Sequence, residues 1–331
     1  TETLCDEEHL WSVNTINQRN RKTRKNGELV YLEPDNSYKT MKTIDMVDNV
    51  RVWGNRRLNY RIPRVEPVEF EKKNLMIDPY VLGVILGDGC ITKQNQPHFV
   101  TKDEQIIDEV KTLYDKVSIK EQSRDVEKEV DGELVLVKRS LTRVNFLGIK
   151  DELKVLGLYG CNSETKFIPE DYIYSSVEDR VKVLQVLVDT DWSIDSHRIE
   201  VTTVSKTMAS QIREIVLSLG GTCSINEKEA FYTKGDVRVD CKLAYRVNFS
   251  FPSDIGFNPC KLDRKLSKYN GRTKYSDNKF ISSIEYYGEE ESQCIMVDNP
   301  EHLYVTDDYI VTHNTTLITR MANTAYNLGY N

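Results

Sequence analysis

Apolar and polar positions follow the same order twice along the chain. Residues 80–88 and 180–191 are each predicted to form an apolar helix that ends on a carboxylate. Strand-like sequence follows in both places, and residues 103–114 and 205–219 then place apolar side chains at the spacing of an amphipathic helix. The pattern therefore predicts an internal duplication.

The sequence before and after this duplicated block alternates short strand-like pieces with turns. Residues that favour strands cluster at 49–53 and 60–63, and Pro63 and Pro67 close this stretch because proline cannot continue a strand ladder. A strand pattern returns at 279–284. The flanks therefore predict mainly β structure around a centre that contains helices.

Length and composition are those of a globular protein with more than one core. The chain has 331 residues, of which 39% are hydrophobic and 29% are charged, and this length predicts two domains. No apolar run approaches the roughly 20 residues that a membrane helix needs, and the start of the chain has no signal-peptide pattern. We therefore expect a cytosolic protein without a membrane partner.

Charge is distributed unevenly. The net charge of −7 is not that of a typical nucleic-acid-binding domain. Two clusters are nonetheless basic, namely Arg19, Arg21, Lys22, Arg24 and Lys25, and later Lys261, Arg264, Lys265, Lys268, Arg272 and Lys274. Each is either a solvated loop or a contact for a phosphate backbone. The seven cysteines include no C-x-x-C pair, which argues against disulfides and a zinc site.

The residues with the most specific chemistry are His313, Asn314 and Thr315. The side-chain amide of an asparagine can attack its own backbone carbonyl, which closes a succinimide and cuts the chain after that residue. A neighbouring imidazole can protonate the leaving amine, and the next residue can supply a hydroxyl nucleophile. Taken alone, the tripeptide is a weak signal that favours a polar surface turn.

The stretch from Cys294 to Asn314 resembles the C-terminal splicing motifs of inteins, which excise themselves from a host protein. The resemblance implies that His313 assists the cut at Asn314, and that His302 is the second helper histidine of the motif. It also makes Thr315 the residue that receives the upstream peptide and is then released. No cofactor is expected for this splicing chemistry.

Residues 4–13 resemble the intein motif T-x-x-H, with His9 as its histidine and Asp6 where Thr or Ser is usual. The resemblance implies that His9 polarises the scissile peptide at the N-terminal end of the intein. Because several strands normally separate this motif from the first nucleophile, we expect an intein fragment, or one half of a split intein whose N-terminal fragment is a separate partner. The alternative is that Cys5 is itself the first intein residue.

Residues 315–322 resemble the end of a phosphate-binding loop, G-x-x-x-x-G-K-[ST], and the helix after it, without the Gly and the Lys. A helix start that lacks those residues cannot bind phosphate in the usual way. We therefore expect residues 315–331 to belong to a host ATPase of the replicative-helicase or terminase kind, in a phage or bacterial gene. A P-loop NTPase proper is the rival interpretation.

The duplicated block resembles the two-copy LAGLIDADG homing endonucleases, whose αββαββα repeats pair through their motif helices. Glycines four residues apart lie on one helix face and allow a partner helix to come close. The predicted helix interface consists of Gly83, Gly87, Val186 and Thr190. This pairing places Asp88 and Asp191 as catalytic ligands of Mg²⁺, which prefers oxygen ligands and can activate water for phosphodiester cleavage. Two buried helices with solvated acids at their ends are the alternative.

Further residues are expected to bind DNA or to take part in its cleavage. Lys166 lies in a passage that resembles the one presenting an active-site lysine in this family, where it would stabilise phosphate charge; an ordinary surface lysine is equally compatible. The strand-like segments 199–203 and 245–249 are candidates for a ribbon in the major groove of double-stranded DNA. The predicted DNA-binding residues are Arg246, Asn248, Lys261, Arg264, Lys265 and Lys268.

The second copy departs from the family pattern at two positions. Val186 stands where Gly is usual, so the helices are expected to approach less closely. Trp192 stands where Gly follows the acid, and a bulky residue resists the left-handed backbone that often ends a helix. These departures keep open a catalytically degenerate DNA-binding insert as the alternative to an active nuclease.

Together these patterns predict an α+β protein with two activities, protein splicing and metal-dependent cleavage of double-stranded DNA. Its mainly-β splicing domain, of the Hint type, is divided in sequence and rejoined in space. The predicted segments are residues 1–70 and 254–314 for the splicing domain, 71–253 for the endonuclease domain and 315–331 for the host protein. An inactive intein fragment is the alternative for the first activity.

Overall fold

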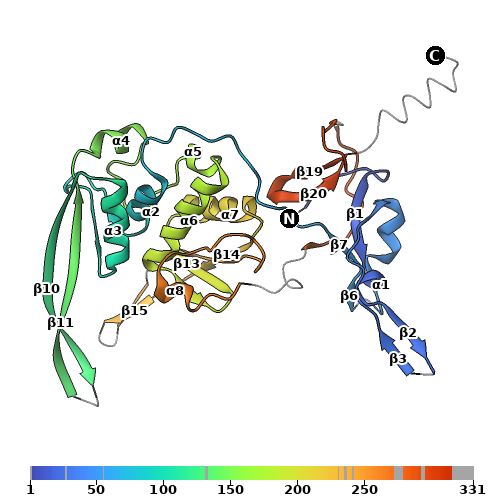
Figure 1. The fold of residues 1–331 in the computed structure, drawn as a ribbon, viewed down its shortest axis with the longest axis horizontal. Coiled ribbons are helices and arrows are strands. Elements are labelled where there is room, and N and C mark those ends of the chain that lie inside the picture. The colour runs from blue at the N-terminus through green and yellow to red at the C-terminus, as the bar shows by residue number, and fades with distance from the viewer. Residues whose placement is uncertain are drawn as a thin grey trace. The chain divides into compact units, whose positions relative to one another are not determined.

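The structure of the chain is a computed structural model. It describes residues 2–314 except 27, 55, 131–132, 230, 235–236, 241, 272–278 and 292–294. The chain divides into two compact units, of which one combines Thr1–Val65 with Tyr275–Asn331 and the other is Glu66–Lys274 (Figure 1). The described elements are helices and small antiparallel sheets, which confirms the mixed α and β class predicted from the sequence.

Two helices lie at the centre of the larger unit, α2 (Pro79–Gly87) and α6 (Val177–Asp191). Asp78 caps the start of α2 by accepting hydrogen bonds from the backbone of Tyr80 and Val81, and Ser176 caps α6. Every residue of α2 from Pro79 to Leu86 is buried, so this helix is an interior element without a solvent face.

Each central helix opens a block with the same order of elements. The first block continues with β8 (Gly89–Cys90), β9 (His98–Thr101), α3 (Glu104–Leu113), β10 (Val117–Val130), β11 (Glu133–Phe146) and α4 (Lys150–Val155). The second continues with β12 (Ser193–Asp195), β13 (Arg198–Thr203), α7 (Lys206–Ser218), β14 (Thr222–Lys228), β17 (Ala244–Ser250) and α8 (Asp263–Leu266). Helix α5 (Glu170–Ile173) precedes the second block, and the hairpin of β15 (Phe231–Lys234) and β16 (Val237–Asp240) interrupts it.

The sheets of the two blocks have one topology. In each four-stranded sheet, the strands lie in the order first, second, fourth, third, and all neighbours are antiparallel. In the first block, β10 and β11 continue into a long ribbon (Figure 1). The internal duplication predicted from the apolar pattern is therefore present in the fold.

Each sheet packs one face against helices and leaves the other face polar. Along β17, Val247 and Phe249 are buried in the core, whereas Arg246 and Asn248, which alternate with them, are partly exposed. This alternation is what a strand requires when only one face is covered. The polar face of the second sheet is the surface on which DNA-reading residues were predicted.

A buried arginine attaches the segment that enters the larger unit. The guanidinium of Arg180 donates hydrogen bonds to the carbonyl oxygens of Ser175 (3.0 Å) and Val68 and to the hydroxyl of Ser218 (2.5 Å). It also lies 4.7 Å from the centre of the Phe70 ring. Because Arg180 is fully buried, these contacts are shielded from water and fix the entering segment to α6 and α7.

The segment after β17 also packs in the larger unit, which differs from the predicted end of the insert at residue 253. The carboxylate of Asp189 accepts hydrogen bonds from the backbone N–H groups of Lys261 (2.9 Å) and Leu262 (3.2 Å). Cys260 and Leu262 are buried in the same core as α2 and α6. This stretch is basic, but its apolar residues make it part of the second block.

The smaller unit is mainly β. Its elements are β1 (Leu10–Thr15), α1 (Ile16–Arg19), β2 (Lys22–Lys25), β3 (Glu28–Tyr31), β4 (Lys39–Lys42), η1 (Ile44–Asn49), β5 (Arg51–Val52), β6 (Arg57–Leu58), β7 (Tyr60–Ile62), β18 (Lys279–Phe280), β19 (Leu303–Thr306), η2 (Asp307–Tyr309) and β20 (Ile310–His313). Four of the strands form a sheet in the order β18-β7-β1-β4 over a small core of Trp11, Val13, Met46, Tyr60 and Ile62.

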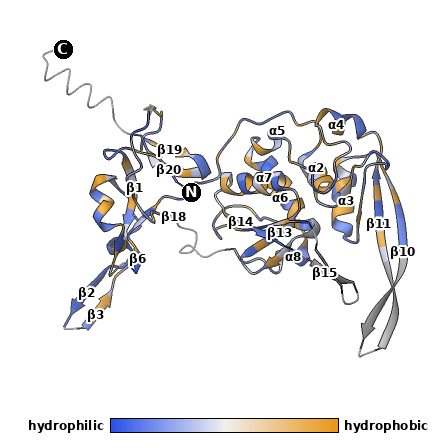
Figure 2. Cartoon of the chain, turned by 180° about the vertical axis from the view of Figure 1, so that it is seen from behind, coloured by the Kyte–Doolittle hydropathy of each residue, from blue (hydrophilic) through white to orange (hydrophobic). Residues whose placement is uncertain are grey.

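The strand predicted at 49–53 is only two residues long, since the 3-10 helix η1 ends at Asn49, and the strand predicted at 279–284 ends at Phe280. Figure 2 shows the contrast within one hairpin of this unit, where β2 is hydrophilic and much of β3 is hydrophobic. Among the described residues of the whole chain, no helix is long and apolar enough to cross a membrane.

Candidate functional sites

In the smaller unit, the first strand meets the last. His9, directly before β1, and Thr312 of β20 are both buried, and Nε2 of His9 lies 2.6 Å from the Thr312 hydroxyl oxygen. The His9 ring also forms a T-shaped pair with Trp11, with ring centres 5.3 Å apart. The fold therefore brings the predicted splicing histidine to the strand that leads into the predicted cleavage residue.

The predicted C-terminal site is assembled on the hairpin of β19 and β20. The backbone N–H of Asn314 donates to the carbonyl of His302 (2.8 Å), and the Asn314 side-chain amide donates to Ile295 (3.4 Å). Nδ1 of His313 donates to the carbonyl oxygen of Asn314 (2.8 Å), and its ring centre lies 5.8 Å from that of His302. Four of the five predicted splicing residues thus share one unit; Thr315 lies outside the described residues.

This geometry changes the role expected of His313. The sequence assigned its imidazole to the leaving amine, whereas in the structure the ring contacts the oxygen of the carbonyl that would be attacked. A donor on that oxygen draws electron density from the carbonyl carbon and favours attack on it. The predicted residue is therefore in place, in contact with a different atom.

Burial sets the protonation of His9. Desolvation lowers its pKa, the carboxylate of Asp6 partly opposes this by raising the pKa, and His313 lowers it further. A neutral imidazole is favoured, which can accept as well as donate a hydrogen bond.

In the larger unit, Lys166 closes the end of α2. Its ammonium donates hydrogen bonds to the carbonyl oxygens of Ile85 (2.9 Å), Leu86 (3.0 Å) and Gly89 (2.6 Å), which lie at the end of α2 and at the start of β8. Burial lowers the pKa of Lys166 to about 8, although the nearby carboxylate of Asp88 opposes that shift. The predicted lysine is therefore next to the predicted acid rather than on an open surface.

Lys265 has the same position in the second block. Its ammonium donates to the carbonyl oxygens of Val188, Thr190 (3.5 Å) and Trp192 (2.9 Å) at the end of α6, and burial lowers its pKa. The prediction that Lys265 binds DNA from the surface is wrong, because the side chain is buried. Sequence reasoning missed this pairing with Lys166, although both lysines follow the fourth strand of their block.

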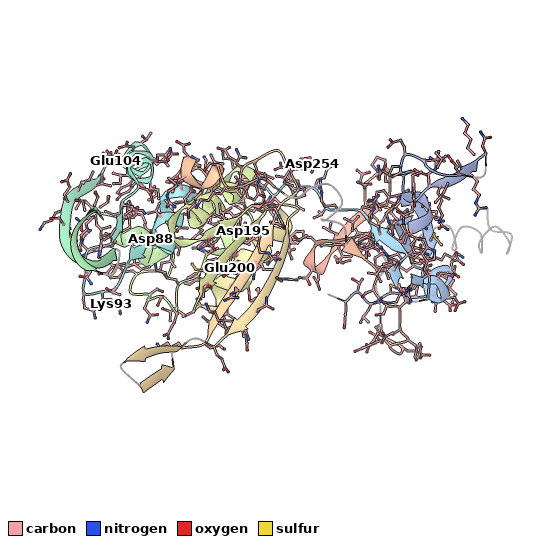
Figure 3. All side chains as sticks on the ribbon, turned by 90° about the horizontal axis from the view of Figure 1, so that it is seen from below. Asp88, Lys93, Glu104, Asp195, Glu200 and Asp254 are labelled. Atoms are coloured by element: carbon pink, nitrogen blue, oxygen red, sulfur yellow. The ribbon has the colours of Figure 1, made fainter. Side chains whose placement is uncertain are left out.

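The central helices touch at equivalent positions. A Cβ atom added at Gly83 would lie 2.0 Å from Cγ1 of Val186, and one added at Gly87 would lie 2.4 Å from the hydroxyl oxygen of Thr190. The methyl group of Val186 fills the space that Gly83 leaves, so the two helices meet at this position with a valine in place of a second glycine. Asp88 follows directly after this contact, where its backbone N–H ends α2 (Figure 3).

The second helix ends differently from the first. Asp191 is the last residue of α6, and its side chain lies outside what the structure describes. Trp192 leaves the helix in an extended conformation (φ −91°, ψ 150°), and its buried ring packs against Phe249 at 5.8 Å. Trp192 therefore needs no left-handed backbone. Among the described residues, no cluster of three His, Cys, Asp or Glu side chains is arranged to hold a metal.

The helix contact predicts the effect of a methyl group. Gly83→Ala alone is expected to lower the free energy of unfolding by about 1–3 kcal/mol, because the added Cβ collides with a stiff valine. In a Val186→Ala background the collision with the methyl group is removed, and the carbonyl oxygen of Val183 remains 3.1 Å from the added Cβ. The better helix propensity of alanine offsets part of the remaining cost, so the loss should shrink by about 1 kcal/mol or more. Urea denaturation of the four variants measures this difference; a uniform loss in both backgrounds would contradict the contact.

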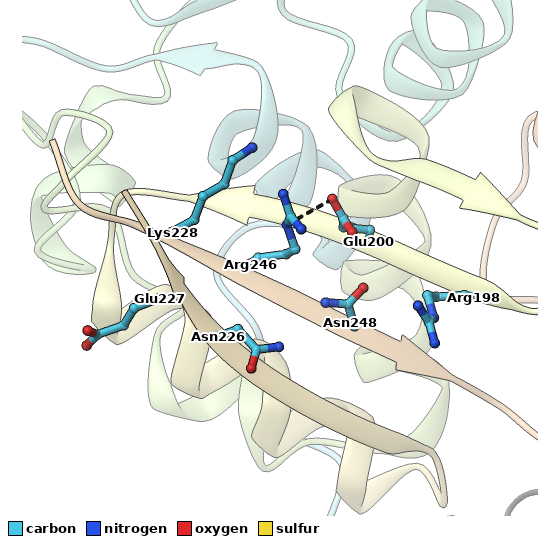
Figure 4. A pocket seen from close by; sticks show the side chains of 7 residues that line it. All are labelled: Arg198, Glu200, Asn226, Glu227, Lys228, Arg246 and Asn248. Atoms are coloured by element: carbon cyan, nitrogen blue, oxygen red, sulfur yellow. Dashed lines mark ion pairs between the residues drawn. The ribbon is translucent and has the colours of Figure 1, made fainter. Parts of the chain in front are cut away.

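The polar face of the second sheet carries a pocket of about 340 Å³ (Figure 4). It is lined by Arg198, Glu200, Asn226, Glu227, Lys228, Arg246 and Asn248. Nε of Arg246 lies 3.3 Å from a carboxylate oxygen of Glu200, so this arginine is oriented across the strands. The predicted residues Arg246 and Asn248 therefore lie together on an open surface.

Two other residues predicted to bind DNA form ion pairs within the protein. Lys261 pairs with Glu109 at 2.8 Å, and Arg264 makes two hydrogen bonds to Asp103, at 2.9 and 2.8 Å. Both carboxylates belong to the start or body of α3, so these pairs join the second block to the first. Lys268 is exposed, and among the predicted residues of this stretch it best retains a surface position.

No protein-family model matches the chain. Over 324 residues the chain is 23% identical to the replicative DNA helicase DnaB of Mycobacterium intracellulare, a match that covers 95% of this chain and 48% of that protein. The chain thus spans about half the length of this curated relative.

Solved structures with some similarity include the homing endonuclease I-DmoI. Its complex with DNA and Ca has 13% identity and a TM-score of 0.32 over 57% of this chain and 95% of that chain. Its complex with DNA and Mn has 13% identity and a TM-score of 0.26, over 52% and 88% respectively.

Proposed function

We propose that the smaller unit is the splicing domain of an intein, with a Hint-type fold, and that it cuts the chain after Asn314. The observation that carries this proposal is the hydrogen bond between His9 and Thr312, residues separated by 303 positions. It gathers the two predicted splicing motifs from opposite ends of the described chain.

The proposed cut uses a carbonyl that His313 already contacts. Nδ2 of Asn314 bonds to its own carbonyl carbon, the bond from that carbon to the nitrogen of Thr315 breaks, and a proton moves from the amide to the leaving amine. His313 polarises the carbonyl through its hydrogen bond of 2.8 Å, and His302 lies near the His313 ring. The hydroxyl of Thr315 has the chemistry to carry the upstream peptide.

We further propose that the larger unit is an endonuclease of the LAGLIDADG kind that cuts double-stranded DNA. Helices α2 and α6 contact at equivalent positions and end on Asp88 and Asp191, and a buried lysine holds each end. Carboxylate oxygens fit Mg²⁺, so these two aspartates would hold it. When bound, the metal would activate water and neutralise phosphate charge.

The open face of the second sheet supports DNA as the partner. Arginine and asparagine side chains can read guanine and adenine in the major groove. Arg246 and Asn248 are two residues apart on β17, and both line the pocket on the polar face of the sheet. We assign Lys268 to phosphate. Lys166, poised by burial beside Asp88, would stabilise charge on the scissile phosphate.

The similarity to part of a replicative DNA helicase supports a host of that kind. We assign residues 315–331 to the host ATPase, where they would continue a P-loop. An intein and its host work where DNA is replicated, so we place the protein in the cytosol.

A DNA-binding insert without catalysis is the second candidate for the larger unit. It is favoured by Trp192, which replaces the glycine found at the equivalent position after Asp88 and sends the chain away from α6 in an extended conformation. This difference would place the second metal ligand unlike the first.

The mass of the intact chain tests the splicing proposal. After incubation at neutral pH, we expect a product that ends at Asn314 and a released peptide that begins at Thr315. Asn314→Ala, which lacks the attacking amide, should keep the full mass. If the parent chain keeps its full mass under conditions in which the smaller unit is folded, the proposed cut does not occur.

A further inference from the structure

The contact between Thr312 and His9 has a consequence for the order of the splicing steps. Thr312 has no exposed surface and His9 is 9% exposed, so water cannot take the place of either partner. In an extended chain, residues two apart lie on the same face. The hydroxyl of Thr312 therefore lies on the face of β20 that continues to Asn314, which is also buried.

We propose that Thr312 is a positioning residue that makes the cut at Asn314 depend on the protonation of His9. The inference rests on the proposed splicing function and deepens it, since neither residue type alone would link the two ends of the intein. The link is the single hydrogen bond of 2.6 Å between Nε2 of His9 and the Thr312 hydroxyl.

The chemistry of the two groups gives the direction of the effect. Beside a neutral imidazole, the Thr312 hydroxyl can donate its hydrogen to Nε2. A protonated imidazole has an N–H on both nitrogens, so the hydroxyl must then accept, and its own hydrogen turns to another acceptor. Asn314 lies two residues further along the chain, and its side-chain oxygen would be such an acceptor. A hydrogen bond to that oxygen would turn the amide nitrogen from the carbonyl of Ile295, its present partner, toward the backbone carbonyl of Asn314.

The groups that act on His9 come from three sides. Asp6 precedes β1 and favours the charged ring, His313 of β20 disfavours it, and burial by the surrounding core disfavours it most. The ring of His9 also packs against Trp11 in a T-shaped pair, and its Nε2 faces Thr312. Capture of a proton by His9 during the step at the N-terminal end would therefore prepare the step at Asn314.

The first test is spectroscopic and does not need the cut. In an Asn314→Ala background, nitrogen NMR of labelled histidines follows the titration of His9. Thr312→Val should move its midpoint and change the tautomer of the neutral ring, Thr312→Ser should restore both, and Thr23→Val in the exposed strand β2 should leave both unchanged. An unmoved His9 titration in Thr312→Val overturns the link.

The second test is the rate of peptide release from the chain that retains Asn314. With Thr312 or Ser present, the rate should rise about tenfold as the pH falls through the His9 midpoint, which corresponds to one hydrogen bond. Thr312→Val and His9→Gln should both lose this rise. If the release rate of Thr312→Val depends on pH in the same way as that of the parent chain, the inference is overturned. If no variant releases the peptide although NMR shows the link between His9 and Thr312, the result counts against the proposed splicing function instead.

Discussion

Replacing Asp88 with Asn is expected to lower the rate of DNA cleavage by at least about 10³-fold in the presence of Mg²⁺. A bound metal contributes several kcal/mol to stabilising the charge that develops on phosphate, and about 4 kcal/mol corresponds to that factor. Asparagine keeps the size of the side chain. It also keeps the backbone N–H of residue 88, which donates to Val84 (3.0 Å) and ends α2. The fold should therefore be retained.

A pool of duplexes with randomised sequence measures this effect, because the target need not be known and cut ends can be sequenced. Asp108→Asn, on the exposed side of α3, is the matched control for loss of one negative charge and should cut like the parent. Equal cleavage by Asp88→Asn and the parent would contradict the metal role. Binding without cleavage by the parent would favour the non-catalytic insert.

Replacing Arg180 with Met is expected to lower the free energy of unfolding of the larger unit by about 3–5 kcal/mol. The side chain donates to two backbone carbonyls and one hydroxyl in a region without water, and each acceptor left unpaired costs about 1–3 kcal/mol. Methionine fills similar volume, so the loss reports on hydrogen bonds more than on a cavity. It should also release the segment around Val68.

Urea denaturation followed by tryptophan fluorescence gives the free energy, and limited proteolysis near Val68 reports the release of the entering segment. Arg198→Met is the control, since this arginine lies exposed at the start of β13. It should change stability by less than about 0.5 kcal/mol. Equal stability of the two variants would show that the buried guanidinium does not hold the segment.

The elements of the larger unit were predictable because their apolar spacing is regular. The helices expected at 103–114 and 205–219 are found as α3 and α7 within a residue of each bound. The smaller unit was less predictable. Its strands are two to six residues long. Short segments such as 44–49 are compatible with several local conformations, and tertiary contacts select one of them.

The sequence identifies many of the candidate site residues, but it does not predict which groups their side chains contact. Lys265 belongs to a run of basic residues that predicts an exposed surface. Only the fold shows that backbone carbonyls at the end of α6 surround its ammonium. The bond from His9 to Thr312 joins positions 303 residues apart. No local pattern encodes such a distance, because strand register and packing of both chain segments set it together.

The contact between α2 and α6 also bears on how the two blocks diverged. In a symmetric ancestor assembled from two identical halves, each position at the axis would meet its own copy. Here Gly83 meets Val186, and the methyl group of one half occupies the space vacated by the other. Two copies of the second block would place valine against valine in a gap that holds only one side chain. The contact surface of each block is therefore complementary to the other block and not to a copy of itself. A single chain that contains both blocks ensures that the complementary surfaces meet.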